Sequence, residues 1–262
     1  MATYESEAIV LKIFDFGESD KIITLLSKDF GKITAIAKGA KRSKIRFVRK
    51  LELFTKLHIR FADNKHSDMV RIDEAELLAP YPSLSLDYER FLCANLVCEL
   101  LLNWATGDKD HNLYNLAAWT FVHIALHNPL SSLLLFQLHL LTILGFHLHL
   151  SSCTLCNAAM QPGGDFLFIA EQNGIVCRKC IDKQNKQPTI QPAQHIPLSI
   201  GSLKILEKAR EINPDKWSRF HFSKNSLQEV TFLFKSHNHY LLQRDIISWR
   251  HLEDYLREIK RI

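Results

Sequence analysis

The chain has 262 residues, of which 47% are hydrophobic and 23% are charged, values that exclude wholesale disorder and fit one to three small domains. Its 33 Lys and Arg residues against 28 Asp and Glu residues give a net charge of +5. None of its nine glycines falls in a GxxxxGKS/T or GxGxxG pattern, which argues against a P-loop ATPase or a Rossmann enzyme.

We expect a cytoplasmic protein. The acidic start of the chain lacks the apolar core of a secretory signal. The most apolar stretch, Leu130 to Leu150, carries polar residues throughout and is more typical of a buried helix than of a membrane span. In the cytoplasm, six cysteines are expected to be thiols or metal ligands rather than disulfides.

Residues 1–80 have the patterns of β-structure. Short runs of β-branched and apolar residues alternate with turn residues, and the expected strands are Ala8–Phe16, Lys21–Ser27, Lys32–Lys38, Leu51–Phe61 and Val70–Leu78. Five short strands joined by short turns predict a small closed barrel. Periodicity alone leaves an SH3-like barrel open as the competing fold.

From Leu86 onward the apolar spacing becomes helical. The expected helices are Phe91–Trp104, Leu113–Ala125, Leu130–Gly145, Ser199–Glu211, Ser226–Tyr240 and Trp249–Ile259. A cysteine-containing segment interrupts them. We therefore predict an α+β protein of several parts: a barrel over 1–80, a helical domain over 81–150 and 198–262, and a module inserted over 151–197.

The inserted segment holds two CxxC pairs, Cys153 with Cys156 and Cys177 with Cys180, separated by 20 residues. Two such turns can aim four thiolates at one ion, and this spacing is typical of zinc sites. Phe166–Ala170 and Gly174–Val176 are the expected strands of a ribbon around the site. Disulfides, unliganded thiols and an iron–sulfur cluster are the alternatives. Because four thiolates close the coordination shell, the predicted Zn²⁺ is structural, one per chain.

The remaining candidates for chemistry are weaker. His123 and His127 have the spacing of a zincin motif but Ile124 stands where the glutamate is needed. Cys93 and Cys98 lie in an apolar helix and are expected to be core thiols. We predict no catalytic residue.

The stretch from Phe30 to Leu51 contains no acidic residue and eight cations. Its centre, Lys38 to Lys50, lies between expected strands and should form an exposed loop. We predict nucleic-acid contacts there, with cations on phosphates and Phe47 stacked on a base. The predicted contact residues are Lys38, Lys41, Arg42, Lys44, Arg46, Phe47, Arg49 and Lys50. A merely solvated loop is the plain alternative, and an anionic membrane surface is a weaker one.

Several strings of the sequence resemble the RecO family of bacterial recombination and repair mediators. In the first segment they are Glu7–Lys12, Gly17–Leu25, Gly31–Arg42 and Phe54–Thr55; later they are Leu135–Phe146, the two CxxC pairs, Lys235–Ser236 and Tyr240–Leu241. Their order matches over nearly the whole chain. Two positions depart, because Asn157 and Asn173 stand where the family has glycine. Asn tolerates a left-handed backbone, so the turns should persist.

The resemblance implies an OB-fold barrel, a helical domain and a zinc finger. It implies a non-enzymatic mediator that binds single- and double-stranded DNA and anneals complementary strands. It also implies two protein partners, RecR and the acidic C-terminal tail of the single-stranded DNA-binding protein. With RecR, such a protein helps load the RecA recombinase onto coated strands, which places it in the cytoplasm at the nucleoid.

Two other functions are weighed against this one. A metal-dependent hydrolase acting on nucleic acid would need an open metal site or clustered carboxylates, for which the nearest group is Asp63, Asp68, Asp73, Glu74 and Glu76. A zinc-ribbon transcription regulator would need a recognition helix or a dimerisation element. We also expect the protein partners to bind the helical region, whose Trp104, Trp119 and Leu130–Leu150 exceed what one small core needs.

Overall fold

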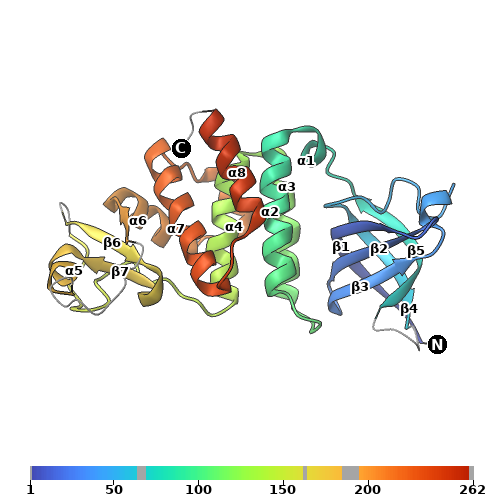
Figure 1. Ribbon diagram of the computed structural model, residues 1–262, viewed down its shortest axis with the longest axis horizontal. Coiled ribbons are helices and arrows are strands. Elements are labelled where there is room, and N and C mark those ends of the chain that lie inside the picture. The colour runs from blue at the N-terminus through green and yellow to red at the C-terminus, as the bar shows by residue number, and fades with distance from the viewer. Residues whose placement is uncertain (1, 64–68, 162–163, 185–194, 260–262) are drawn as a thin grey trace. The chain divides into compact units, whose positions relative to one another are not determined.

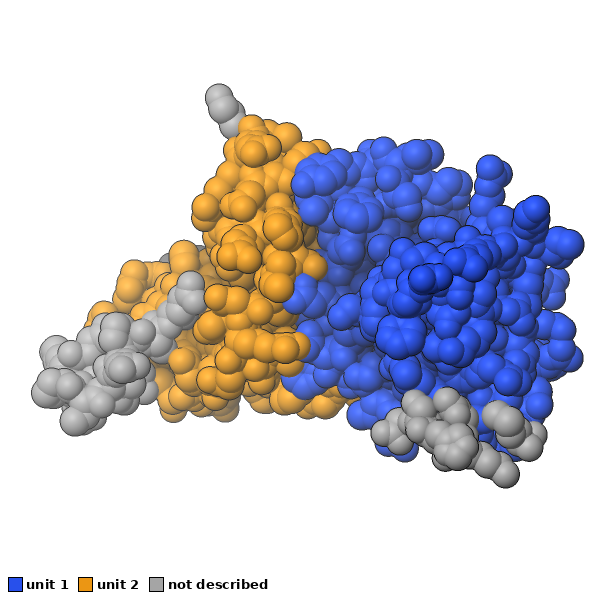
Figure 2. Space-filling model, turned by 45° about the vertical axis from the view of Figure 1, so that its right-hand side comes forward, with its two compact units in different colours: residues 1–126 blue, residues 127–262 orange. Residues whose placement is uncertain are grey.

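The computed structural model describes residues 2–63, 69–161, 164–184 and 195–259. Asp68 and parts of the predicted inserted module, 162–163 and 185–194, therefore lie outside the described residues. The chain divides into two compact units, residues 1–126 and 127–262, which Figure 2 shows in blue and orange. None of the described helices is both long and apolar enough to cross a membrane.

Unit 1 begins with a closed five-stranded barrel, drawn in blue and cyan in Figure 1. Its strands are β1 (Thr3–Phe16), β2 (Asp20–Ser27), β3 (Gly31–Ala37), β4 (Lys56–Ala62) and β5 (Val70–Ala79). They close in the order β1-β2-β3-β5-β4, with a parallel β3–β5 pair and antiparallel pairs elsewhere. This is the strand order of an OB-like barrel, so the SH3-like alternative is wrong.

Successive side chains of a strand point to opposite faces, so every second residue of each strand points into the barrel. Val10, Ile23, Leu25, Leu57 and Ile59 are all at most 1% exposed and form its core. The five expected strands are present within a few residues at most positions, because half-buried strands carry a clear period of two.

The expected strand Leu51–Phe61 is wrong in its first half, since β4 begins only at Lys56. The break lies at Phe54, whose φ of 68° is left-handed and incompatible with a strand. Phe54 is nonetheless 1% exposed, and its ring meets those of Phe91 and Phe121 at centroid distances of 6.0 and 5.8 Å. Phe54 is out of phase with the buried Leu57, Ile59 and Phe61 of β4, and its side chain packs against helices instead.

The helices of unit 1 are α1 (Ser83–Leu86), α2 (Tyr88–Trp104) and α3 (His111–Leu126). The loop after α2 closes against the β2–β3 end of the barrel. Lys32 Nζ donates to Leu102 O at 2.8 Å. Gly31 has a φ of 62°, and a Cβ there would lie 2.2 Å from Asp108 O, so only glycine allows this approach.

Unit 2 combines four main helices with a three-stranded sheet. The helices are α4 (Pro129–Ile143), α6 (Ile200–Arg210), α7 (Lys224–Leu242) and α8 (Ile247–Glu258). The sheet has the order β7-β6-β8, with β6 (Phe166–Ile169), β7 (Gly174–Cys177) and β8 (His195–Leu198), and the short α5 (Arg178–Gln184) follows β7. Strand β8 was not expected from the sequence.

Helix α4 forms much of the unit 2 core. Asn128 caps it by accepting from Ser131 N, and Pro129 follows in the first turn. Leu133, Leu134 and Phe136 are all completely buried. The apolar stretch of α4 is therefore core, whereas Trp119 of α3, also counted in the expected surplus, is 47% exposed.

Candidate nucleic-acid interface and metal centre

The four cysteines of the inserted segment come together. All four Sγ atoms lie within 4.8 Å of one another, and the Cys156 and Cys177 sulfurs are 3.7 Å apart. Sulfurs around a tetrahedral ion with metal–sulfur bonds of about 2.3 Å are separated by about 3.8 Å. The donor type and the spacing therefore fit one metal ion held by Cys153, Cys156, Cys177 and Cys180.

Local turns aim these thiols. After Cys156 the chain reverses at Asn157, whose N–H donates to Cys153 O at 2.9 Å and whose φ is 59°. Asn173, just before β7, has a φ of 48°. Both asparagines thus adopt the left-handed conformation expected of them, and the turns persist without glycine.

Gly174 at the start of β7 is required for a different reason. A Cβ there would lie 2.6 Å from His149 O and 2.8 Å from Thr154 Cγ2. The backbone of His149 runs beside it, donating to Asn173 O and accepting from Ile175 N at 2.9 Å. The His149 side chain is exposed, as is that of His147. This close approach fixes the first CxxC turn against the second.

The cluster favours ionised sulfur at its buried end. Burial of the Cys153 thiol opposes ionisation, but N–H groups of Cys177, Cys156 and Leu155 donate to its sulfur and hold its pKa at about 6. One of these donors, Cys177 N, lies 3.4 Å from Cys153 Sγ. A thiolate is the form that binds metal ions.

The basic loop, residues 38–50, joins β3 to β4 in unit 1 and contains a short helical turn at Ala40–Arg42. Its first three cations are paired with acids of the β1–β2 hairpin. Lys38 Nζ lies 2.9 Å from Asp20 Oδ2, Lys41 Nζ lies 3.3 Å from Asp15 Oδ2, and Arg42 Nη2 lies 3.3 Å from Glu18 Oε2. The absence of acidic residues from Phe30 to Leu51 therefore does not leave these three cations unpaired, because the acids come from the neighbouring hairpin.

The later cations of the basic loop are not paired with acids in this way. Within the described ranges, no carboxylate lies in ion-pair distance of Lys44, Arg46, Arg49 or Lys50. Lys44, Arg46 and Arg49 are exposed. These four residues are the part of the loop that is open to an anionic ligand.

Phe47 does not face solvent. It is 4% exposed and belongs to the barrel core, and the Arg46 guanidinium carbon lies 4.3 Å from its ring centroid. The expectation that Phe47 stacks on a base is therefore wrong for this conformation. Instead the ring anchors the basic loop to the barrel and makes a cation–π contact with the Arg46 guanidinium.

Two of the five acidic residues considered for a hydrolase, Asp73 and Glu74, are engaged by arginines. Asp73 Oδ1 lies 2.8 Å from Arg71 Nε, and Glu74 forms an ion pair with Arg60. Across the described segments, the four cysteines are the one group of His, Cys, Asp and Glu side chains close enough to hold a metal ion.

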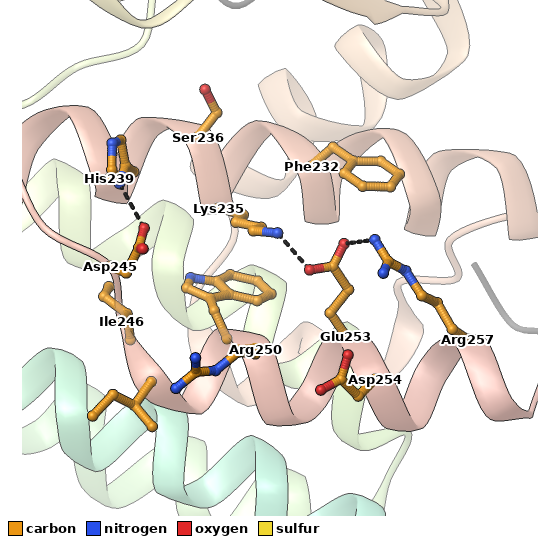
Figure 3. Close-up of a pocket in the computed structure, with 12 residues that line it drawn as sticks. Phe232, Lys235, Ser236, His239, Asp245, Ile246, Arg250, Glu253, Asp254 and Arg257 are labelled. Carbon is orange, nitrogen blue, oxygen red and sulfur yellow. Dashed lines mark hydrogen bonds and ion pairs between the residues drawn. The ribbon is translucent and has the colours of Figure 1, made fainter.

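A groove of about 710 Å³ lies between α7 and α8 in unit 2 (Figure 3). Lys235 and Arg257 reach Glu253 from two sides, and His239 Nδ1 lies 2.9 Å from Asp245 Oδ1. Apolar surface is exposed in it, at Phe232 and Ile247, which are 42% and 56% exposed. The sequence did not single out this groove, because its lining residues are spread over two helices.

Residues 1–81 match the family described as "Recombination protein O N terminal", and residues 85–250 match "Recombination protein O C terminal". The chain belongs to the RecO family. The DNA repair protein RecO of Syntrophus aciditrophicus is 28% identical over 259 residues, which cover 98% of this chain and 97% of that protein. RecO of Syntrophotalea carbinolica is 31% identical over 232 residues, covering 87% of this chain and 86% of that protein.

The resemblance predicted from the sequence is thus confirmed. Membership of the RecO family makes this a protein of DNA repair and recombination, with an OB-like barrel followed by a helical part. The RecO match at residue 81 ends just after β5 ends at Ala79.

Proposed function

We propose that this RecO-family chain is a non-enzymatic mediator that binds single- and double-stranded DNA through its barrel and anneals complementary strands. The observation that carries the proposal is the open half of the basic loop, Lys44 to Lys50, held on an OB-like barrel. Small barrels with such loops are a common arrangement for single-strand binding.

The geometry supports backbone contacts rather than base readout. The cations of the loop sit on long side chains, and the Arg46 guanidinium carbon lies 4.3 Å from the centroid of the Phe47 ring. Such groups neutralise phosphates without reading base edges, so binding should show little sequence preference. Annealing follows from the same property, because a protein that neutralises phosphates lowers the repulsion between two strands.

The test is a triple variant, Lys44→Gln/Arg49→Gln/Lys50→Gln, compared with wild type in single-strand binding at several salt concentrations. Each lost phosphate contact flattens the log–log salt slope by about 0.7, so three contacts flatten it by about 2. The matched control, Lys204→Gln/Lys208→Gln/Lys216→Gln, removes three exposed lysines from unit 2. If both triples bind like wild type, the basic loop is a solvated surface and the DNA site is elsewhere.

We further propose that the cysteine cluster binds one structural Zn²⁺. Four thiolates leave no open position for substrate or water, so the ion would hold the module together and supply no catalytic step. The two CxxC turns and β7 would then be fixed to one another through Cys153, Cys156, Cys177 and Cys180.

The protein partners proposed for this chain are RecR and the acidic tail of the single-stranded DNA-binding protein, and with RecR it would help load RecA onto coated strands in the cytoplasm. We place the tail in the α7–α8 groove. Its exposed Phe232 and Ile247 suit an apolar tip, and Arg250 lies in the groove with no carboxylate in ion-pair distance among the described residues. Arg250→Glu should weaken binding of a tail peptide, whereas Arg244→Glu, outside the groove lining, should not.

A further inference from the structure

We infer that Phe14 and Phe16, at the outer end of β1, form a platform on which bases of a single strand stack. The inference rests on the proposed DNA-binding function and assigns the base contacts of that site. These two rings take the stacking role predicted for Phe47, whose side chain is buried in the barrel core.

The two rings are unusually exposed for this barrel. Phe14 is 44% and Phe16 is 48% exposed, whereas Phe47, Phe54 and Phe61 are at most 4% exposed. The core of the barrel is filled by other side chains, so packing inside it does not account for the two rings. Covering the two phenylalanine rings with a ligand would remove a large apolar area from water, which favours binding.

Both rings lie on one face of the sheet. Phe14 pairs with Ile22 and Phe16 with Asp20 in an unbroken antiparallel register. Residues two apart on a strand share a face and are separated by about 6.6 Å. That separation is about twice the 3.4 Å rise per nucleotide of a stacked strand, so the two rings can engage bases of one extended strand.

Three cations lie near this platform, and two of them, Lys38 and Lys41, are paired with acids of the β1–β2 hairpin. Lys12 Nζ lies 5.9 Å from the centroid of the Phe14 ring. Lys41 Nζ binds both Asp15 Oδ2 and Gly17 O, residues that flank Phe16 in sequence, at 3.3 and 3.2 Å. Lys38 binds Asp20, the cross-strand neighbour of Phe16. Stacking surfaces beside phosphate-binding cations are the arrangement by which OB-folds hold single strands.

The platform occupies the free end of the sheet. At the opposite end of β2 and β3, Lys32 N donates to Thr106 O at 2.6 Å and Lys32 Nζ donates to Leu102 O, so the loop after α2 lies against that end. The β1–β2 hairpin and the basic loop meet at the other end, where Lys41 N donates to Ser19 O at 2.9 Å. In OB-folds, oligonucleotides bind over strands 2 and 3 and the loop between strands 1 and 2.

The test separates base stacking from phosphate binding by using two oligonucleotides of equal length, poly-dT and its abasic counterpart. Stacking contributes about 1–3 kcal/mol per base, so wild type should bind the abasic strand at least about fivefold more weakly. Phe14→Leu/Phe16→Leu keeps apolar volume but removes both ring faces. This leucine variant should bind the base-bearing and the abasic strand with equal affinity, and the salt dependence of its binding should be that of wild type.

Two further variants keep the outcome interpretable. Phe14→Trp/Phe16→Trp should restore the preference for base-bearing strands, which a merely structural role of the rings would not predict. Leu78→Ala, a change at a leucine of β5 that is 43% exposed, should leave the preference as in wild type. Thermal unfolding of each variant checks that the barrel is intact.

The possible results differ in what they overturn. If the leucine variant still prefers base-bearing DNA as wild type does, the stacking platform is refuted while the DNA-binding function stands. If wild type binds neither strand, the proposed function fails and the platform fails with it. If the leucine variant keeps the full base preference but loses RecR in a binding assay, the two rings are a protein-docking surface.

Discussion

Asp20 holds Lys38 and fixes the start of the basic loop: its Oδ2 lies 2.9 Å from Lys38 Nζ, while its Oδ1 accepts from Gly39 N at 2.9 Å. The N–H of Gly39, the Lys38 ammonium and the Ser19 hydroxyl together lower the pKa of Asp20 to about 2. This carboxylate therefore links the β1–β2 hairpin to the loop from two directions.

A first prediction concerns acid sensitivity. The pKa of Asp20 is lower in the folded chain than in the unfolded one, so its stabilising effect is present above about pH 4 and is lost as pH falls towards 2. Asp20→Asn should lower stability at pH 7 and flatten its fall between pH 4 and 2. Urea unfolding at each pH measures this, with Asp215→Asn, an equal charge change at an exposed acid of unit 2, as control. Parallel pH curves for wild type and Asp20→Asn would contradict it.

A second prediction is that the hairpin acids restrain DNA binding. Asp15 and Glu18 neutralise Lys41 and Arg42, and their side chains are 63% and 92% exposed, so a phosphate can displace them. Asp15→Asn/Glu18→Gln should tighten single-strand binding several-fold at low salt and steepen the salt slope by about 0.7 for each released cation. Glu211→Gln/Asp215→Asn makes the same charge change in unit 2 at two exposed acids that form no ion pair among the described residues. Equal gains in the two double variants would mean that only net charge matters.

A third prediction concerns the metal. Purified protein should contain one zinc per chain, and Cys177→Ser/Cys180→Ser should lose it. Binding of a structural zinc contributes about 10–16 kcal/mol in small fingers, so the module should become sensitive to protease while the barrel stays resistant. The control, Cys93→Ala/Cys98→Ala, changes two buried thiols of α2 outside the cluster and should retain the metal. Zinc retained by the serine variant would rule out this ligand set.

A fourth prediction concerns His237 in α7. Asn173 Nδ2 donates to His147 O, so its Oδ1 faces His237 and accepts from Nε2 at 3.0 Å. Nδ1 is buried and has no hydrogen-bond partner among the described residues. A proton added there would be a buried, unpaired charge, and burial lowers the pKa of His237 to about 4.

Because the unfolded chain binds this proton first, stability should fall between about pH 6.5 and 4, by ~3 kcal/mol from this imidazole. His237→Gln should flatten that fall, whereas His221→Gln, an exposed histidine, should not. Urea unfolding at pH 7 and pH 5 gives the comparison, and pH effects on the metal site are common to all three proteins. An unchanged pH dependence in His237→Gln would show that the imidazole is not responsible.

The sequence predicts the structure well where a residue pattern has a single physical explanation, such as a period of 3.6 for a helix. The helices and most strands follow from periodicity, and the cysteine cluster follows from spacing. Phe54 shows the limit, because its left-handed backbone and its burial against Phe91 and Phe121 come from packing against helices, which a period of two does not describe. Strand β8 is only four residues long and contains Pro197, so it has little pattern to detect.

The basic loop shows a second limit. An aromatic residue between cations suggests a base-stacking group, yet Phe47 is in the core, whereas Phe14 and Phe16 of β1 are exposed. Composition shows which groups are present but not which face they occupy. The acids that neutralise Lys41 and Arg42 are Asp15 and Glu18, which lie in or beside the β1–β2 turn. Their pairing depends on the turn lying beside the basic loop, which is a feature of the fold and not of the local sequence.

The closure of the barrel has a consequence for how this protein associates. A strand at the edge of an open sheet offers unpaired N–H and C=O groups, to which another chain can add a strand of its own. Here the parallel β3–β5 pair completes the ring, so β1 to β5 each have a neighbour on both sides. A closed barrel therefore favours contacts through side chains and loops over the addition of a partner's strand, and it lowers the risk of edge-to-edge aggregation between copies of this chain.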